Sequence, residues 1–84
     1  MKVTQELVDR LRKYNADNQC DGVSLSGPKT DFFVSVEEDN SLIVVDDYGN
    51  IPIYDFDEEI ELDFDSGDTT QEFIDLLKKH GFIG

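Results

Sequence analysis

The sequence predicts an α+β fold, an antiparallel meander sheet of four or five strands flanked by an N-terminal and a C-terminal helix. Three observations support this prediction. Apolar residues recur at helical spacing near both ends of the chain. Between these ends, short apolar segments follow one another. Their connections are too short for the crossovers that parallel strands need. A length of 84 residues predicts a single domain, residues 1–84.

The first predicted helix covers residues 4–15, with Thr4 as its N-cap. Leu7, Leu11 and Tyr14 fall on one face at i, i+4, i+7 spacing, so this face is expected to pack on the sheet. A run of Asn, Asp and Gly residues then ends the helix.

The predicted strands follow in sequence. Segments 23–26 and 31–37 alternate apolar and polar residues, which is typical of strands with one buried face. The continuous apolar run 42–45 predicts a central strand covered on both faces. Segment 51–56 contains Pro52, which cannot donate a ladder hydrogen bond, so this strand should start late or lie at an edge.

Segment 55–68 contains eight carboxylates and no basic residue. Residues 57–59 are expected to form a bulge or bend, and residues 60–65 then alternate apolar and acidic side chains like a half-buried strand. On such a strand the acids would stand in a row about 6.6–6.8 Å apart, given a rise of about 3.3–3.4 Å per residue. This spacing is similar to that of neighbouring phosphates along a nucleic-acid strand.

The C-terminal helix is expected to begin at Thr69, which forms a capping-box match with Glu72. A stripe of apolar residues starts at Phe73 and predicts the buried face. Gly81 is the expected C′ residue, and Phe82 can fold back on the stripe in a Schellman-type contact.

Charge is the strongest global feature of the chain, with a net value of −13. The interval 30–77 holds 16 of the 20 acids and none of the seven Lys and Arg residues. Phosphates would repel such a protein, which excludes direct binding to nucleic acid or an anionic bilayer. A basic protein partner would be attracted. One sheet face is expected to be covered by the helices, and the other to be partly open and acidic.

The cellular compartment is predicted from the cysteine count and from the apolar segments of the chain. A single cysteine, Cys20, excludes an internal disulfide and favours a reducing cytoplasm, which is the host cytoplasm if the chain is phage-encoded. No apolar run approaches the ~18–20 residues of a membrane span. The N-terminus lacks the apolar region of a signal peptide.

No catalytic site, metal site or cofactor is predicted. The acids are many and are not set in an apolar pocket that would separate their pKa values for acid–base work. An EF-hand loop counted from Asp55 places Ile60 where Gly is required and Ser66 where Glu is required. His80 and Cys20 lie in different elements and fall short of a zinc site. We therefore expect a non-enzymatic protein.

The predicted partner-binding surface combines acids, which steer a basic partner, with two tyrosines as anchors. Its members are Asp46, Asp47, Tyr48, Tyr54, Asp55, Asp57, Glu58, Glu59, Glu61, Asp63 and Asp65. Phe33, Phe56 and the two tyrosines lie either on an exposed face and in turns, or within a sheet that is covered on both sides.

In size, acidity and helix–sheet–helix order, the chain resembles the small acidic inhibitors encoded by phages and mobile elements. These include DNA-mimic antirestriction proteins, uracil-DNA glycosylase inhibitors and type II anti-CRISPR proteins. Residues 25–27 leading into 31–37, and the helix 69–80, resemble parts of an anti-CRISPR protein that blocks the PAM-reading region of Cas9. The resemblance implies an inhibitor of a basic nucleic-acid-binding protein or nuclease, such as a Cas effector. It assigns no site residue.

Two alternatives remain open at the level of sequence. The first is an immunity protein or antitoxin that neutralises a cationic nuclease toxin with the same acidic surface. The second is an accessory domain that binds divalent cations through some of its many carboxylates.

Overall fold

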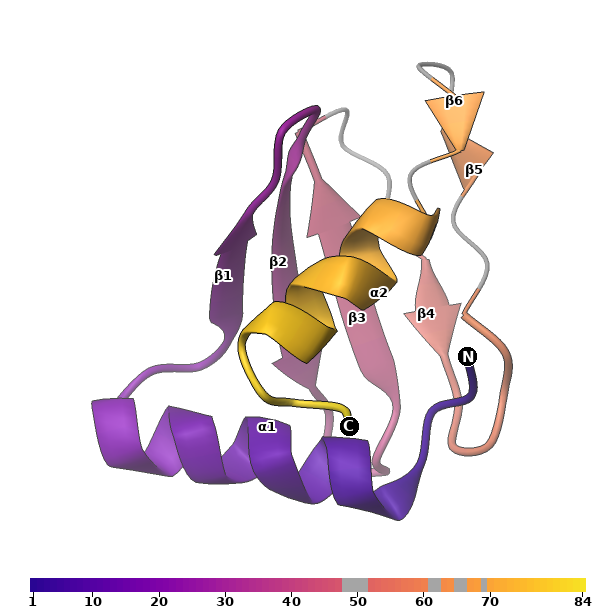
Figure 1. The fold of residues 1–84 in the computed structure, drawn as a ribbon. Helices are drawn as coiled ribbons and strands as arrows, with labels where there is room; N and C mark the ends of the chain where they lie inside the picture. The colour runs from indigo at the N-terminus through magenta and orange to yellow at the C-terminus, as the bar shows by residue number, and fades with distance from the viewer. Residues whose placement is uncertain (48–51, 61–62, 65–66, 69) are drawn as a thin grey trace.

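The computed structural model describes residues 1–47, 52–60, 63–64, 67–68 and 70–84. Its elements, in chain order, are α1 (Gln5–Asn18), β1 (Val23–Ser26), β2 (Asp31–Val36), β3 (Leu42–Asp46), β4 (Ile53–Tyr54), β5 (Asp63–Phe64), β6 (Gly67–Asp68) and α2 (Thr70–Lys79). Strands β1, β2, β3 and β4 form an antiparallel sheet in that order, whereas β5 and β6 pair with each other. The predicted α+β meander with a helix at each end is confirmed (Figure 1).

Both helices lie on the same side of the sheet (Figure 1). Alternate side chains of the strands point toward them and are buried, as the alternation in sequence predicts. The rings of Phe32 and Phe73 lie with centroids 5.2 Å apart, which joins β2 to α2. Leu7 and Leu11 bring α1 into the same core. The sheet therefore has one covered face and one open face.

Local caps explain where α1 begins and ends. Thr4 Oγ1 accepts a hydrogen bond from the Leu7 amide at 3.3 Å, which confirms the predicted N-cap. The helix runs past the predicted end at residue 15 because Gln19, with φ 53°, supplies the left-handed C-cap. An ion pair between Lys13 and Asp17, 2.6 Å apart, spans the added turn and supports it.

The end of α2 is a Schellman motif, as predicted. Gly81 has a φ of 82°, a conformation that costs glycine little. The Gly81 amide donates to the Lys78 carbonyl at 3.1 Å, and the Phe82 amide donates to the Leu77 carbonyl at 2.9 Å. Phe82 is thereby buried, with its ring edge-on to Tyr14 at a centroid distance of 5.7 Å. This contact joins the end of α2 to α1.

The predicted capping box at the start of α2 includes Thr69, which lies outside the described residues. Its expected partner, Glu72, binds elsewhere: its Oε1 accepts a hydrogen bond from the Lys29 amide at 3.0 Å. Lys29 lies in the turn between β1 and β2, where the Gly27 amide also donates to the Thr30 carbonyl at 3.1 Å. This hydrogen bond of Glu72 therefore joins α2 to the turn between β1 and β2.

The prediction that the run 42–45 is covered on both faces is wrong. Leu42 and Val44 are fully buried, but Ile43 and Val45 are only half-buried because both described helices, α1 and α2, lie on the other side of the sheet. β4 is short and pairs only with β3 among the described strands, as Pro52 predicted. The Pro52 carbonyl still accepts a hydrogen bond from the Val44 amide at 3.1 Å.

The described residues of the predicted strand 60–65, which are Ile60, Asp63 and Phe64, do not pair with the main sheet. Asp57 adopts a left-handed conformation with φ 67°, which turns the chain after β4. Residues 57–60 then run beside residues 1–3 in antiparallel fashion, with a bridge between Lys2 and Glu59. The described part of the predicted strand, β5, pairs with β6 instead. The turn at Asp57 thus directs residues 58–60 to the N-terminal segment instead of the meander.

Candidate partner-binding surface

The exposed acids that follow β4 form one compact unit, which we call the acidic turn (residues 55–59). Its four carboxylates, Asp55, Asp57, Glu58 and Glu59, are all exposed. The Glu58 amide donates to the Asp55 carbonyl at 3.1 Å and closes the turn. Aspartate tolerates the left-handed conformation better than most residues, which suits Asp57 to its position. The carboxylates thus project from a defined backbone.

The N-terminal segment fixes this backbone in place. The Asp57 amide donates to the Val3 carbonyl at 2.6 Å, and the Val3 amide donates to the Glu58 carbonyl at 2.8 Å. The Ile60 amide donates to the Met1 carbonyl at 2.7 Å. Val3 and Ile60 are buried in the core, so the pairing is also held by apolar contacts. Sequence reasoning missed this pairing, because three residues are too few to show a strand period.

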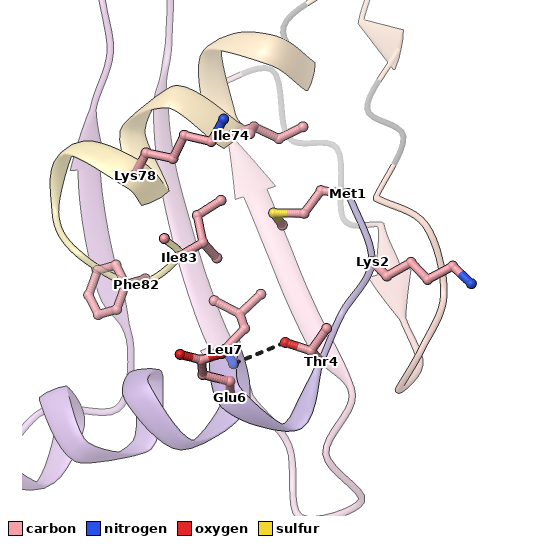
Figure 2. Close-up of a pocket in the computed structure, with 10 residues that line it drawn as sticks. Met1, Lys2, Thr4, Glu6, Leu7, Ile74, Lys78, Phe82 and Ile83 are labelled. Carbon is pink, nitrogen blue, oxygen red and sulfur yellow. Dashed lines mark hydrogen bonds between the residues drawn. The ribbon is translucent and has the colours of Figure 1, made fainter.

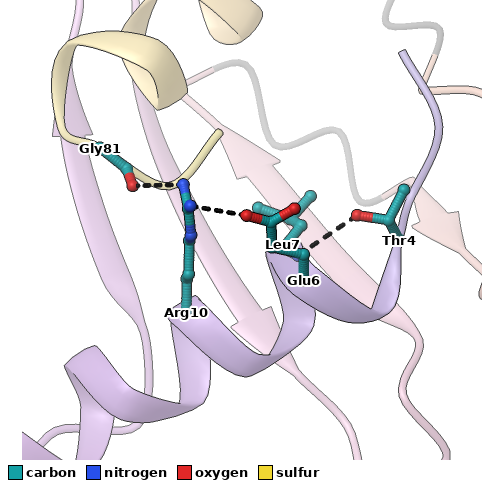
Figure 3. Close-up of polar contacts among 5 residues, drawn as sticks. All are labelled: Thr4, Glu6, Leu7, Arg10 and Gly81. Carbon is teal, nitrogen blue, oxygen red and sulfur yellow. Dashed lines mark hydrogen bonds and ion pairs between the residues drawn. The ribbon is translucent and has the colours of Figure 1, made fainter. Parts of the chain in front are cut away.

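Arg10 and Arg12, the two arginines of α1, bind groups outside the acidic turn. Arg10 Nη2 pairs with Glu6 Oε1 at 2.6 Å, and its Nη1 donates to the Gly81 carbonyl at 3.0 Å (Figure 3). Arg12 Nη2 donates to the Glu37 carbonyl at 2.9 Å. Glu59 pairs with the Met1 amino group at 2.9 Å. Within the described ranges, the other three carboxylates of the acidic turn form no ion pair, so their charge is available to a partner.

The predicted contacts Asp46 and Asp47 serve the fold. Asp46 is only 6% exposed, so it does not belong to the surface as predicted. Asp47 is exposed, but its Oδ2 accepts a hydrogen bond from the Asp31 amide at 3.0 Å. The Asp47 amide in turn donates to Thr30 Oγ1 at 3.2 Å. These bonds satisfy backbone groups where the pairing of β2 with β3 ends.

The predicted tyrosine anchors do not form an exposed pair among the described residues. Tyr54 is 7% exposed and belongs to the core, because it lies on the helix-facing side of β4. The predictions for Tyr48, Glu61 and Asp65 lie outside the described residues. Asp63 begins β5, in the separate hairpin.

The open face of the sheet is apolar at its centre, contrary to the prediction of an acidic face. Phe33 is 42% exposed and Ile53 is 61% exposed, while Ile43 and Val45 are half-buried. We call these four residues the apolar patch. The sequence did contain the signal, since all four occupy alternate positions opposite to the buried ones. Phe33 and Phe56 are exposed, which resolves the open question for these two aromatic residues.

Acidic side chains lie at both ends of the apolar patch. Asp31 begins β2 and Asp47 follows β3, so both lie at one end of the sheet. Glu37 follows β2 and Asp55 follows β4, at the other end. A shallow hollow of about 270 Å³ lies beside Phe33 and Val45 at the first end. The acids thus flank an apolar centre.

A second hollow, of about 320 Å³, lies between the N-terminal segment, α1, α2 and the C-terminal residues (Figure 2). Its walls are mainly apolar side chains, including Leu7, Ile74 and Ile83. Glu6 also lines it, but its carboxylate is paired with Arg10. Nothing in this arrangement supplies a nucleophile with an adjacent base.

Metal and thiol chemistry find no support in the described part of the chain. No group of three or more His, Cys, Asp or Glu side chains is placed to hold a metal ion there. The half-buried Cys20 directs its Sγ to Asn15 Oδ1 at 3.6 Å. His80 is exposed, just after α2.

Comparison with protein-family models, with curated proteins and with solved structures gives no match for this chain. Neither α1 nor α2, nor any other helix within the described ranges, is long and apolar enough to cross a bilayer. Inference about function therefore depends on the surface itself.

Proposed function

We propose that the chain is a non-enzymatic inhibitor that binds a basic nucleic-acid-binding protein or nuclease and occupies its nucleic-acid site. The observation that carries this proposal is the acidic turn. Three of its exposed carboxylates, on Asp55, Asp57 and Glu58, form no ion pair with any residue that the structure describes, and three backbone hydrogen bonds hold residues 57–60 against the N-terminal segment. Acids carried on a backbone that is held in place are suited to replacing a polyanion.

Fixed geometry matters because binding costs entropy when a loop or side chain must be ordered. The acidic turn is ordered before the partner arrives, so this cost is lower than for a flexible acidic tail. The net charge of −13 would also attract a cationic site from a distance. Such steering raises association rates by about 10–10³-fold at low salt.

The chemistry of the partner follows from these acids. A nuclease or Cas-type effector holds nucleic acid in a channel lined by Lys and Arg, and reads a PAM through arginines. Those cations would pair with the carboxylates of the acidic turn. The resemblance to phage-encoded acidic inhibitors favours this class of target.

The same surface fits an immunity protein that neutralises a cationic nuclease toxin, and that alternative differs only in its target. The cation-binding alternative receives no support from the described residues, which hold no group of three potential metal ligands. Calorimetry with Ca²⁺ distinguishes the cation-binding alternative from both inhibitor functions. Tight stoichiometric binding of Ca²⁺ would favour that alternative over both of them.

The proposal is tested by measuring inhibition and association with a purified Cas9–guide complex and a panel of cationic nucleases. The test variant is Asp55→Lys/Glu58→Lys. Its control is Asp21→Lys/Asp75→Lys, which changes the net charge equally at exposed acids outside the acidic turn. We expect the test variant to associate at least tenfold more slowly at low salt, and the control to change by less than threefold. Equal slowing by both variants would contradict the role of the acidic turn. Absence of inhibition across the panel would refute the inhibitor function.

A further inference from the structure

We infer that the open face of the sheet docks on the protein partner, with the apolar patch at the centre of the interface and the flanking acids at its rim. This inference rests on the proposed function and adds the chemistry of the partner surface. That surface would present apolar side chains at its centre and Lys or Arg around them.

The strand register makes the apolar patch continuous. Phe33 lies opposite Val45, and Ile43 lies opposite Ile53. Ile43 and Val45 are two residues apart on β3, about 6.6–6.8 Å along the strand. The four side chains therefore form two adjacent rows across β2, β3 and β4.

These four positions carry apolar side chains although they lie on the open face of the sheet. Exposed sheet positions are normally polar, and the same face carries Ser24 and Ser35 at other sites. Ile53 nevertheless remains 61% exposed beside Ile43 on the short edge strand β4. Contiguous exposed apolar side chains rimmed by polar residues mark interaction sites.

Charge selects the occupant of this face. Asp31 and Asp47 at one end, with Glu37 and Asp55 at the other, would repel phosphates and anionic lipids. A second copy of the chain would bring the same acids against themselves, with a net charge of −13 on each molecule. A basic protein surface is complementary to both the apolar centre and the acidic rim.

The open face and the acidic turn are continuous. Asp55 belongs to the acidic turn and directly follows Tyr54, the last residue of β4. A partner on the apolar patch would thus meet the acidic turn at the edge of the interface. The patch would then supply the apolar contact and the turn the electrostatic attraction.

Two synthetic helical peptides test this inference with the full chain. Both carry the same number of lysines, and one has a Leu and Phe face where the other has Ser. We expect the apolar peptide to bind at least tenfold more tightly, with amide shift changes in NMR on β2, β3 and β4. In Val45→Thr/Ile53→Thr this preference should fall below threefold. Both substitutions keep a β-branched side chain, which preserves the strand preference.

The control is Tyr14→Ser, which removes an exposed apolar side chain, 39% exposed, from α1; because its ring also contacts Phe82, circular dichroism must first show that this variant is folded. The control should keep the tenfold preference. Equal binding of both peptides, or a preference that survives Val45→Thr/Ile53→Thr, would overturn the docking surface. If the two peptides bind equally and both bind more weakly as the salt concentration rises, the proposed recognition of a basic partner by charge is retained. If neither peptide binds at low salt, both proposals fail. A dimer in sedimentation that Val45→Thr/Ile53→Thr abolishes would identify a second copy as the occupant and overturn the inference.

Discussion

The ring of Phe33 lies across the bare Cα of Gly22. A Cβ built at Gly22 would come within 2.7 Å of Phe33 Cε1 and meet the Cζ atom as well. Phe33 pairs with Ser24, so Gly22 is its diagonal neighbour on the same face of the sheet. The aromatic ring covers the glycine backbone and is itself held against it. Phe33 is therefore an exposed side chain whose position the fold controls.

Gly22→Ala should destabilise the protein, because the Phe33 ring must move away to admit the methyl group. Because the ring is 42% exposed and can turn aside, the cost should lie at the low end of the about 1–3 kcal/mol that overpacking costs in a core. Urea denaturation would measure the change. Gly84→Ala is the control, since a Cβ there meets nothing within 4 Å. Equal stability of the two variants would contradict the close packing of Phe33 on Gly22.

Gly81→Ala should also destabilise the protein, but for a conformational reason. A Cβ at Gly81 has open space around it, so the cost arises from its φ of 82°. A left-handed conformation costs a residue other than glycine roughly 1–2 kcal/mol. Thermal unfolding should show a smaller loss for Gly81→Asn than for Gly81→Ala, because asparagine tolerates this conformation. The reverse order would argue against the Schellman motif.

Glu72→Ala should loosen the turn between β1 and β2. The substitution removes the acceptor for the Lys29 amide, and a hydrogen bond of this kind contributes roughly 1 kcal/mol. Amide hydrogen exchange at Lys29 should accelerate several-fold. Glu72→Gln keeps an acceptor oxygen and should preserve most of the protection. Unchanged exchange in Glu72→Ala would show that the contact does not hold the turn in solution.

Asp39 should give the protein a pH-dependent contribution to stability. The Ser41 hydroxyl, at 2.6 Å, and the Ser41 amide, at 3.0 Å, donate to its carboxylate and hold the pKa of Asp39 below its ordinary value of 3.8. Because the pKa is lower in the folded state, the contribution is present above pH 3.8 and is lost as pH falls through the folded-state pKa.

Ser41→Ala should raise the pKa of Asp39, since it removes the stronger of these causes. A pH titration of the Asp39 carboxyl carbon by NMR would measure the shift. Asp39→Asn is the control for stability, because it should remove this part of the pH dependence altogether. A pKa of Asp39 that stays low in Ser41→Ala would assign the effect to another group.

Local signals predicted three of the element ends, whereas the end of α1 was predicted three residues too early. The N-cap at Thr4 and the C′ glycine at Gly81 depend on residues adjacent in sequence, so the sequence alone contains the information. The start of β4 after Pro52 follows from the missing amide hydrogen of proline. The meander followed from alternation and short connections.

Long-range contacts were not predictable in the same way. The pairing of Val3 with Glu58 joins segments far apart in the sequence, and no period marks it. The left-handed turn at Asp57 sends the next residues away from the sheet, which alternation alone could not reveal. Asp47 was predicted as a partner contact from its charge, but its carboxylate accepts the amide of Asp31. The net charge gives the number of acids but does not identify those whose carboxylates bind backbone groups within the fold.

The order of the strands in the sheet bears on how the chain folds. Each of β1, β2, β3 and β4 pairs with its neighbour in sequence, so every hairpin closes a short loop. Short loops carry the least closure entropy, and topologies rich in local contacts fold fastest. The sheet can assemble one hairpin after another as the nascent chain emerges during synthesis.

The pairing of Lys2 with Glu59 has the opposite character. It must wait until residues 57–60 have been synthesised, and its closure spans most of the chain. We therefore expect residues 1–3 to pair with residues 57–60 only after the sheet has formed. The acidic turn would then become rigid only after residues 57–60 have paired with residues 1–3.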